Sequence, residues 1–162
     1  MRLLASTDFA LRVLIRLAAE SEGQHLSVEA LARELGGLSR NHLHKVVQEL
    51  AALGMVRTVR GARGGVALAK PPGEIRLGEL VQRLEAGQSL VECFRADGGA
   101  CVLTPRCRLK GMLGGAWAAF LRELDRSTLA ECLAAAPPAP SLSPVRSPGP
   151  TATRAKKLPA GP

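Results

Sequence analysis

The sequence lacks any long uninterrupted run of apolar residues. A membrane-spanning helix needs about 18 or more such residues in a row, and even the apolar N-terminal segment is broken by Arg2, Asp8, Arg12 and Arg16. That segment also lacks the small-residue cleavage site of a secretory signal peptide. We therefore expect no membrane partner and a cytoplasmic location, where a reducing environment keeps cysteines as thiols.

The chain also lacks the residue patterns of familiar catalytic sites. No C-x-x-C pair is present, which argues against a thiol redox enzyme. The GARGGV segment lacks the lysine of a phosphate-binding loop and leads into a β-prone run. All three histidines lie within the first 44 residues, and no nucleophile and base can be assigned around them. We predict that the protein is not an enzyme.

Positive charge is in excess and unevenly distributed. The chain of 162 residues carries a formal net charge of +8. Residues 1–70 contain ten Lys and Arg against six Asp and Glu, whereas residues 71–136 are balanced. The last 26 residues contain eight prolines and no acidic residue, so we expect residues 135–162 to form a disordered tail. The basic N-terminal part points to a nucleic acid partner, because Lys and Arg neutralise phosphates.

Apolar residues at helical spacing predict helices at both ends of the folded part. The first helix spans residues 6–20, with Ser6 or Thr7 placed to cap it. A short amphipathic helix follows near Leu77, and the last one ends at Leu133.

Two predicted helices in residues 27–53 match a helix-turn-helix. Ser27 begins the first, Gly36 and Gly37 end it, and Ser39 begins the second. The second helix presents polar and basic side chains near its N-terminus, as a recognition helix does in the major groove. A solvated helix surface is the alternative. The predicted DNA contacts in this helix are Ser39, Arg40, Asn41, His42, His44 and Lys45.

A short hairpin with a basic tip follows the second helix. Two β-prone runs, residues 55–59 and 66–68, flank the segment Arg60-Gly61-Ala62-Arg63-Gly64-Gly65. Glycines allow close approach to a phosphate backbone, and an arginine at such a tip can enter the minor groove. We expect Arg60 and Arg63 to contact DNA; solvated loop charge is the alternative. The fold class predicted for residues 1–72 is a winged helix-turn-helix, mainly α with a small β-hairpin wing.

Residues 73–134 are predicted to hold a cysteine-rich loop and a long dimerisation helix. The helix runs from Cys107 to Leu124 and carries a wide apolar stripe that suits packing against another subunit.

Cys93, Cys101 and Cys107 form a C-x7-C-x5-C pattern in a polar, glycine-containing segment, which favours metal ligands over apolar fillers. Structural zinc sites usually contain closer cysteine pairs. The fourth ligand stays open between Cys132, a carboxylate, a small molecule and a group from another part of a dimer.

The order of these segments resembles a known family. STDFALRVL, LSRNHLHKVVQELAALGMV, VRGARGGVALAKPPGEIRLGELV and LVECF, followed by the two later cysteines, are similar to the Rrf-type winged-helix iron-sulfur regulators over about residues 1–133. The most specific feature is the combination of an R-G-x-x-G-G wing with LVECF and C-x5-C. Within the family, the chain most resembles the nitric-oxide-sensing repressor branch.

This resemblance implies an iron-sulfur-dependent transcriptional repressor. The protein would bind palindromic operator DNA as a homodimer and leave it when nitric oxide reacts with its cluster. The resemblance implies a 4Fe-4S cluster on Cys93, Cys101 and Cys107, with Asp8 of the other subunit as fourth ligand. From the residues alone, Asp8 is a solvated or capping carboxylate.

The family usually has five residues between the first two cysteines. This chain has seven, including Gly98 and Gly99, which we expect to bulge.

Two other functions stay open. A regulator of the same fold could report iron-sulfur status or redox stress with a 2Fe-2S cluster, although that branch uses a downstream histidine that is missing here. A zinc-stabilised interaction module, from a different class, would contain zinc and no cluster.

Overall fold

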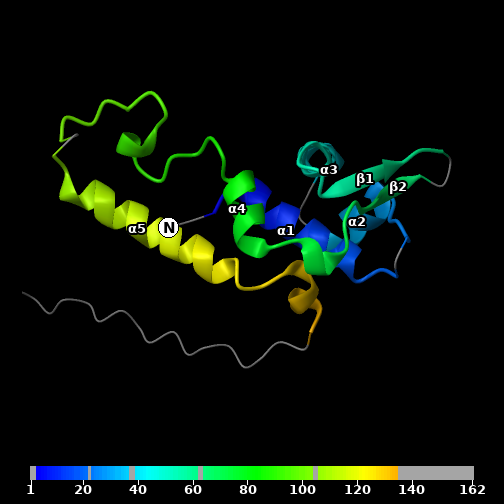
Figure 1. Cartoon of the computed structure of the whole chain (residues 1–162). Coiled ribbons are helices and arrows are strands. Elements are labelled where there is room, and N and C mark those ends of the chain that lie inside the picture. The colour runs from blue at the N-terminus through cyan, green and yellow to red at the C-terminus, as the bar shows by residue number, and fades with distance from the viewer. Residues whose placement is uncertain (1–2, 22, 37–38, 62–63, 104–105, 135–162) are drawn as a thin grey trace, which may run out of the picture.

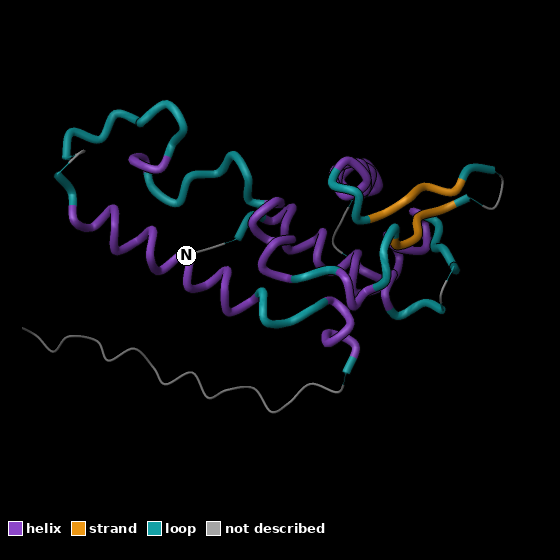
Figure 2. The backbone as a smooth tube through the Cα atoms, in the orientation of Figure 1, coloured by secondary structure: helices purple, strands orange, loops and turns teal. Residues whose placement is uncertain are grey.

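The computed structural model describes residues 3–21, 23–36, 39–61, 64–103 and 106–134. The predictions for Arg63 and for residues 135–162 lie outside these ranges. None of the described helices is long and apolar enough to cross a membrane. Figures 1 and 2 show the elements in chain order, which are α1 (Ala5–Ala18), α2 (Val28–Leu35), α3 (Arg40–Ala52), β1 (Val56–Val59), β2 (Gly65–Leu68), η1 (Pro72–Glu74), α4 (Leu77–Leu84), η2 (Glu92–Phe94), α5 (Arg108–Leu124) and η3 (Leu129–Leu133).

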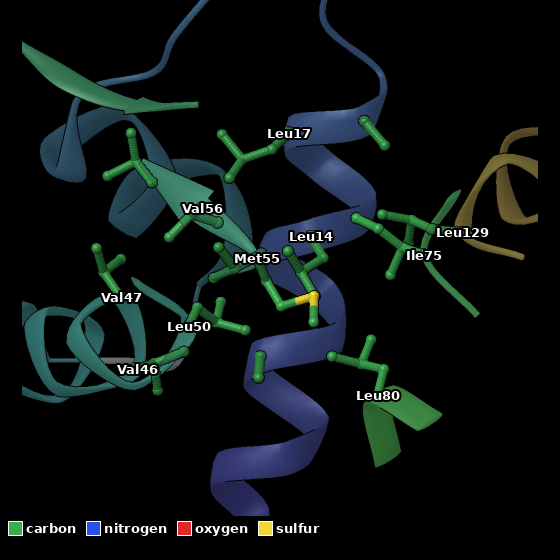
Figure 3. Close-up of a cluster of buried hydrophobic side chains, with 14 of the residues drawn as sticks. Leu14, Leu17, Val46, Val47, Leu50, Met55, Val56, Ile75, Leu80 and Leu129 are labelled. Atoms are coloured by element: carbon green, nitrogen blue, oxygen red, sulfur yellow. The ribbon is translucent and has the colours of Figure 1, made fainter. Parts of the chain in front are cut away.

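Helix α1 lies at the centre of the hydrophobic core. Ala10, Val13 and Leu14 on this helix have no exposed surface. Fully burying a leucine or valine contributes roughly 1.5–3 kcal/mol, so this helix supplies much of the stability of the fold. Figure 3 shows the side chains around Leu14 and Leu17. They come from α3, from β1 and the residue before it, from the residue after η1, from α4 and from η3: Val46, Val47, Leu50, Met55, Val56, Ile75, Leu80 and Leu129.

Serine hydroxyls begin α2 and α3, as predicted. The Ser27 hydroxyl accepts a hydrogen bond from the Ala30 N–H at 3.1 Å, and the Ser39 hydroxyl accepts one from the His42 N–H at 3.3 Å. Gly36 follows α2 with a φ of 57°, a conformation that glycine adopts without steric cost. These caps confirm the limits predicted for the helix-turn-helix.

Helix α1 begins differently from the prediction. Its N-cap residue is Leu4, and no side chain caps it, so the prediction that Ser6 or Thr7 caps this helix is wrong. The Leu4 N–H donates instead to Glu85 Oε1 at 2.9 Å. Thr7 is fully buried inside the helix. The start of α1 is therefore held by a long-range contact with the end of α4 and not by a local cap.

The wing is joined to the helix-turn-helix by a close backbone contact. β1 and β2 pair antiparallel, with Val56 opposite Leu68 and Val59 opposite Gly65. Leu26, just before α2, exchanges two backbone hydrogen bonds with Val66 at 3.0 and 2.8 Å. A Cβ at Gly65 would lie 2.5 Å from the Leu26 carbonyl oxygen. Glycine is therefore required where the two chain segments meet.

Helix α5 packs against α4 through a second glycine. A Cβ at Gly78 would lie 2.3 Å from the Leu121 carbonyl oxygen and 2.5 Å from Asp125 Cβ. The Glu79 N–H donates to Asp125 Oδ1 at 3.0 Å, so the end of α5 caps the first turn of α4. None of the 17 residues of α5 is fully buried in the described chain. Its large apolar side chains are half-buried, except Leu109 and Met112, which are exposed.

We predict that Gly78→Ala separates α4 from α5. The added methyl group overlaps backbone atoms that cannot move independently, so the free energy of unfolding should fall by about 1–3 kcal/mol. Urea unfolding at fixed protein concentration measures this loss. Gly73→Ala is the matched control, because no atom lies within 4 Å of a Cβ at that position. Equal stability of the two variants would contradict the packing described for Gly78.

Candidate functional site

The recognition helix separates its buried and exposed residues clearly. Leu43, Val46, Val47 and Leu50 face the core. Arg40 forms a long ion pair with Glu29 at 3.9 Å and remains 67% exposed in its side chain, so it is accessible to a phosphate. The six DNA contacts predicted for this helix are all exposed in the structure: Ser39, Arg40, Asn41, His42, His44 and Lys45.

An ion-pair network joins α2 to α1. Arg16 on α1 pairs with Glu20 on the same helix and with Glu34 on α2. Hydrogen bonds raise the pKa of Arg16 above its usual value, and the bond to Glu20 has a larger effect than the bond to Glu34. The helix-turn-helix is thereby joined to the central helix through charges at its edge as well as through its core.

The wing tip is a tight, basic turn. Arg60 is exposed. Gly61 has a φ of 118°, a backbone conformation that residues other than glycine rarely adopt. The Gly64 N–H donates to the Gly61 carbonyl oxygen at 2.9 Å, and a Cβ at Gly64 would lie 2.4 Å from the Val59 carbonyl oxygen. The turn therefore needs glycine at both positions. Arg63 lies outside the described residues.

The cysteine loop and the wing lie at opposite ends of the molecule. Figure 1 shows the loop before the N-terminal end of α5, while the hairpin extends from the far side of α1 and α3. Cys93 lies in η2 and is 8% exposed. Cys101 is half-buried, and Cys107, also half-buried, is the N-cap residue of α5.

The three cysteines do not form a closed ligand group in this structure. Among the residues that are described, no cluster of three or more His, Cys, Asp or Glu is arranged to hold a metal ion. All four cysteines are reduced. Cys93, Cys101 and Cys107 therefore share one loop but do not form a site for a single metal ion in this structure.

Cys132 is remote from the loop of its own chain. It lies in η3, beyond the opposite end of α5 from Cys107 (Figure 1). A helix of 17 residues spans about 25 Å at 1.5 Å per residue. The pKa of the Cys132 thiol is raised, mainly by partial burial and to a smaller extent by the negative charge of the neighbouring Glu131. Both observations argue against Cys132 as the fourth ligand within one chain.

Asp8 lies at the surface near the start of α1. Its carboxylate accepts hydrogen bonds from Arg12, with Nη2 2.8 Å from Oδ2 and Nε 3.2 Å from Oδ1. The Arg12 guanidinium also lies 5.6 Å from the centre of the Phe9 ring. Both charged side chains are about half exposed. The carboxylate is therefore accessible to a second molecule, but the structure does not place it with the cysteines of its own chain.

Charged side chains inside the cysteine loop pair with one another, which our sequence analysis missed. Arg95 pairs with Asp97 and approaches Glu92. The hydrogen bond from Arg95, with a smaller effect from the Gly99 N–H, lowers the pKa of Asp97. Two features of the sequence could have indicated these pairs: the turn-forming residues Asp97-Gly98-Gly99, and the spacing of three residues between Glu92 and Arg95.

An apolar groove runs between the start of α1, the segment before η2 and the middle of α5. It encloses about 790 Å³. Trp117 lines it and stacks on Phe120 with ring centres 5.3 Å apart. The other apolar side chains of the groove include Leu3, Leu4, Leu90, Phe94 and Leu113.

Comparison with known proteins agrees with this arrangement. Residues 3–135 match the Rrf2 family, described as an iron-dependent transcriptional regulator. The chain is 47% identical over 133 residues to the HTH-type transcriptional regulator NsrR of Geobacillus kaustophilus, covering 82% of this chain and 90% of that protein. Its identity to the NsrR regulator of Bacillus subtilis is 44% over 129 residues, covering 80% of this chain and 88% of that protein.

The solved structures show the same architecture. CymR (YrzC), the global cysteine regulator of B. subtilis, superimposes with a TM-score of 0.64 at 27% identity, covering 82% of this chain and 95% of CymR. These relatives are transcriptional regulators, which confirms the prediction of a non-enzyme. The helix-turn-helix, wing and long helix occur in the predicted order, and the chain belongs to the Rrf2 family of transcriptional regulators.

Proposed function

We propose that this regulator is a repressor that binds operator DNA as a homodimer and leaves it when nitric oxide reacts with an iron-sulfur cluster. The supporting observation is the presence of both halves of such a sensor in one chain. The recognition helix, with its exposed polar residues, and the wing lie toward one end of the molecule, and the loop with the three thiols lies at the other. The similarity to NsrR regulators supports the choice of signal.

The donor set suits a cluster. Iron-sulfur clusters are held by cysteine thiolates, and none of Cys93, Cys101 and Cys107 is in a disulfide. Cys107 places its sulfur at the N-terminal end of α5, where the helix dipole favours negative charge. No three of these residues are arranged around a single metal ion in the described chain, so we expect the loop to rearrange when the cluster binds. We propose 4Fe-4S as the cluster, with 2Fe-2S as the alternative.

We assign the fourth ligand to Asp8 of the other subunit. A hard carboxylate oxygen holds iron less firmly than thiolate does, so the bound cluster would supply an iron site at which nitric oxide can react. Within its own chain, Asp8 is held by Arg12 at the surface. Exposed ion pairs stabilise a protein by only about 0–1 kcal/mol, so Arg12 can release the carboxylate to a stronger partner.

We assign the dimer contact to α5. The helix has no buried residue in the described chain, and Leu109 and Met112 are 58% and 64% exposed. Uncovered apolar surface of this kind marks a protein interface. Pairing of α5 with its mate would set the spacing of two recognition helices on a palindromic operator.

Helix α1 is the proposed link between the cluster and DNA. Its first turn carries Asp8 and is held to α4 by the bond from Leu4 to Glu85. Its last turn carries Arg16, which binds Glu34 of the helix-turn-helix. Loss of the Asp8 contact would free one end of this rigid helix and change the separation of the two recognition helices.

The decisive prediction concerns iron and nitric oxide together. Protein purified without oxygen should be brown, contain iron and bind a candidate promoter fragment. Titration with nitric oxide should bleach the cluster absorbance and lower DNA affinity in parallel, by about 5- to 150-fold at constant salt. Two results would contradict the proposed signal: a colourless protein that contains zinc, or a cluster protein whose DNA affinity does not change with nitric oxide. Either result would leave the assignment of a DNA-binding fold unaffected.

We predict that Lys45→Ala weakens DNA binding through phosphate contacts. Two contacts are lost per dimer, so the slope of log affinity against log salt should decrease by about two. Binding titrations at several salt concentrations measure the slope. Arg126→Ala is the control, because Arg126 is 76% exposed, pairs with Glu123 and follows the end of α5, outside the recognition helix and the wing. An unchanged slope in Lys45→Ala would remove this residue from the interface.

Asp8→Ala and Arg12→Ala distinguish a ligand from an ion-pair partner. Both variants lose the same surface pair, so their stabilities without cluster should agree within about 1 kcal/mol. Only Asp8→Ala should change the visible absorbance and speed the loss of cluster iron to a chelator. If Arg12→Ala changed the spectrum equally, or if neither variant did, Asp8 would not be the ligand.

A further inference from the structure

We propose that Glu92, Arg95 and Asp97 form a clasp that positions Cys101 beside the turn carrying Cys93, and so prepares this loop for metal binding. The inference rests on the proposed function, because the cluster is what the cysteines would hold. It concerns the seven residues between Cys93 and Cys101.

Arg95 is the centre of the clasp. Its Nε lies 3.0 Å from Asp97 Oδ1 and its Nη2 lies 2.6 Å from Asp97 Oδ2, a two-bond contact between planar groups. The same Nε lies 3.6 Å from Glu92 Oε1. Paired bonds of this type fix direction as well as distance. Arg95 therefore connects the first turn of the loop, at Glu92, with the chain beyond Cys93.

Both carboxylates also bind the backbone just before Cys101. Asp97 Oδ1 accepts a hydrogen bond from the Gly99 N–H at 3.0 Å, and Glu92 Oε1 accepts one from the Ala100 N–H at 3.3 Å. Cys101 follows Ala100 directly, while Cys93 follows Glu92 directly. A single side chain, Glu92, thus holds together the residues that precede two of the proposed ligands.

Gly99 makes the close approach possible. Its φ is 59°, and a Cβ at this position would lie 2.2 Å from the Glu92 carbonyl oxygen and 2.9 Å from the Glu92 carbonyl carbon. The loop backbone is therefore packed directly on η2. Gly98 also has a positive φ, of 81°, but no atom lies within 4 Å of a Cβ there.

The other two cysteines are placed by α5. Cys107 is the N-cap residue of this helix. Phe94, next to Cys93, lines the groove against α5, and a Cβ at Gly114 would lie 3.7 Å from its ring. The clasp adds Cys101 to this frame. Without it, the longer connection would cost more entropy when the thiolates are gathered.

The experiment uses the full chain without cluster and Co²⁺ as the probe. Cobalt bound by thiolates gives an absorbance that reports affinity directly. Arg95→Ala and Gly99→Ala should weaken Co²⁺ binding about tenfold or more, the usual effect of removing groups that orient ligands. Arg126→Ala and Gly98→Ala are the controls and should stay within about twofold of the unmodified chain. Gly98→Ala introduces the same left-handed alanine without the overlap on Glu92.

Hydrogen exchange in the same metal-free samples tests the clasp itself. The amides of Gly99 and Ala100 should exchange more slowly in the unmodified chain than in Arg95→Ala or Gly99→Ala. Equal exchange, or equal Co²⁺ affinity in all four variants, would overturn the inference. Failure of the proposed function gives a different result: the variants would keep their order of Co²⁺ affinity, while the unmodified protein purifies without iron or ignores nitric oxide.

Discussion

The arrangement of the molecule depends on the burial of one helix. α1 is covered on its inward side by α3, β2, α4 and η3, and Ala10, Val13 and Leu14 on that side are fully buried. Interiors packed this tightly move as units, because small displacements would open voids or create overlaps. A displacement at the start of α1 therefore reaches the helix-turn-helix as a rigid-body movement. Polar contacts hold both ends of the helix: Leu4 binds Glu85 after α4, and Arg16 binds Glu34 on α2. A movement that starts at the first contact would be transmitted to the helix-turn-helix through the second.

The cysteine loop is held by interactions of a different kind. Its contacts are exposed ion pairs and single hydrogen bonds around Arg95 and Asp97, each of which stabilises little alone. The wing and recognition helix, by contrast, rest on Leu43, Val46 and Leu50 in the core. Segments with few buried apolar contacts open at low free energy, and sensing regions are commonly drawn from them. The chain thus combines an adaptable cysteine loop with a rigid DNA-binding domain.

The helix-turn-helix was predictable because its signals are local. Ser27, Ser39 and Gly36 act within four residues of the helix ends they determine. The start of α1 was not predictable, because no side chain caps it and its N-cap residue, Leu4, is held by Glu85, 81 residues away in the sequence. The clasp and the Gly78 contact depend likewise on distances that only the folded chain defines. The three cysteines were found from their density in a polar segment, but their separation in space could not be read from spacing.

The long cysteine spacing and the exposed helix α5 have a common physical consequence. Under the proposed function, the clasp holds Cys101 near Cys93 before metal arrives, but no three ligands are arranged around one ion in the described chain. Part of the free energy of metal binding is therefore used to rearrange the loop. The frame for that ordering, Cys107 and the surface that receives Phe94, belongs to α5. Any partner that covers α5 stiffens the frame and lowers the entropic cost of gathering the thiolates. Dimerisation and metal binding should therefore favour each other, even though Cys93 and Cys101 lie on one chain.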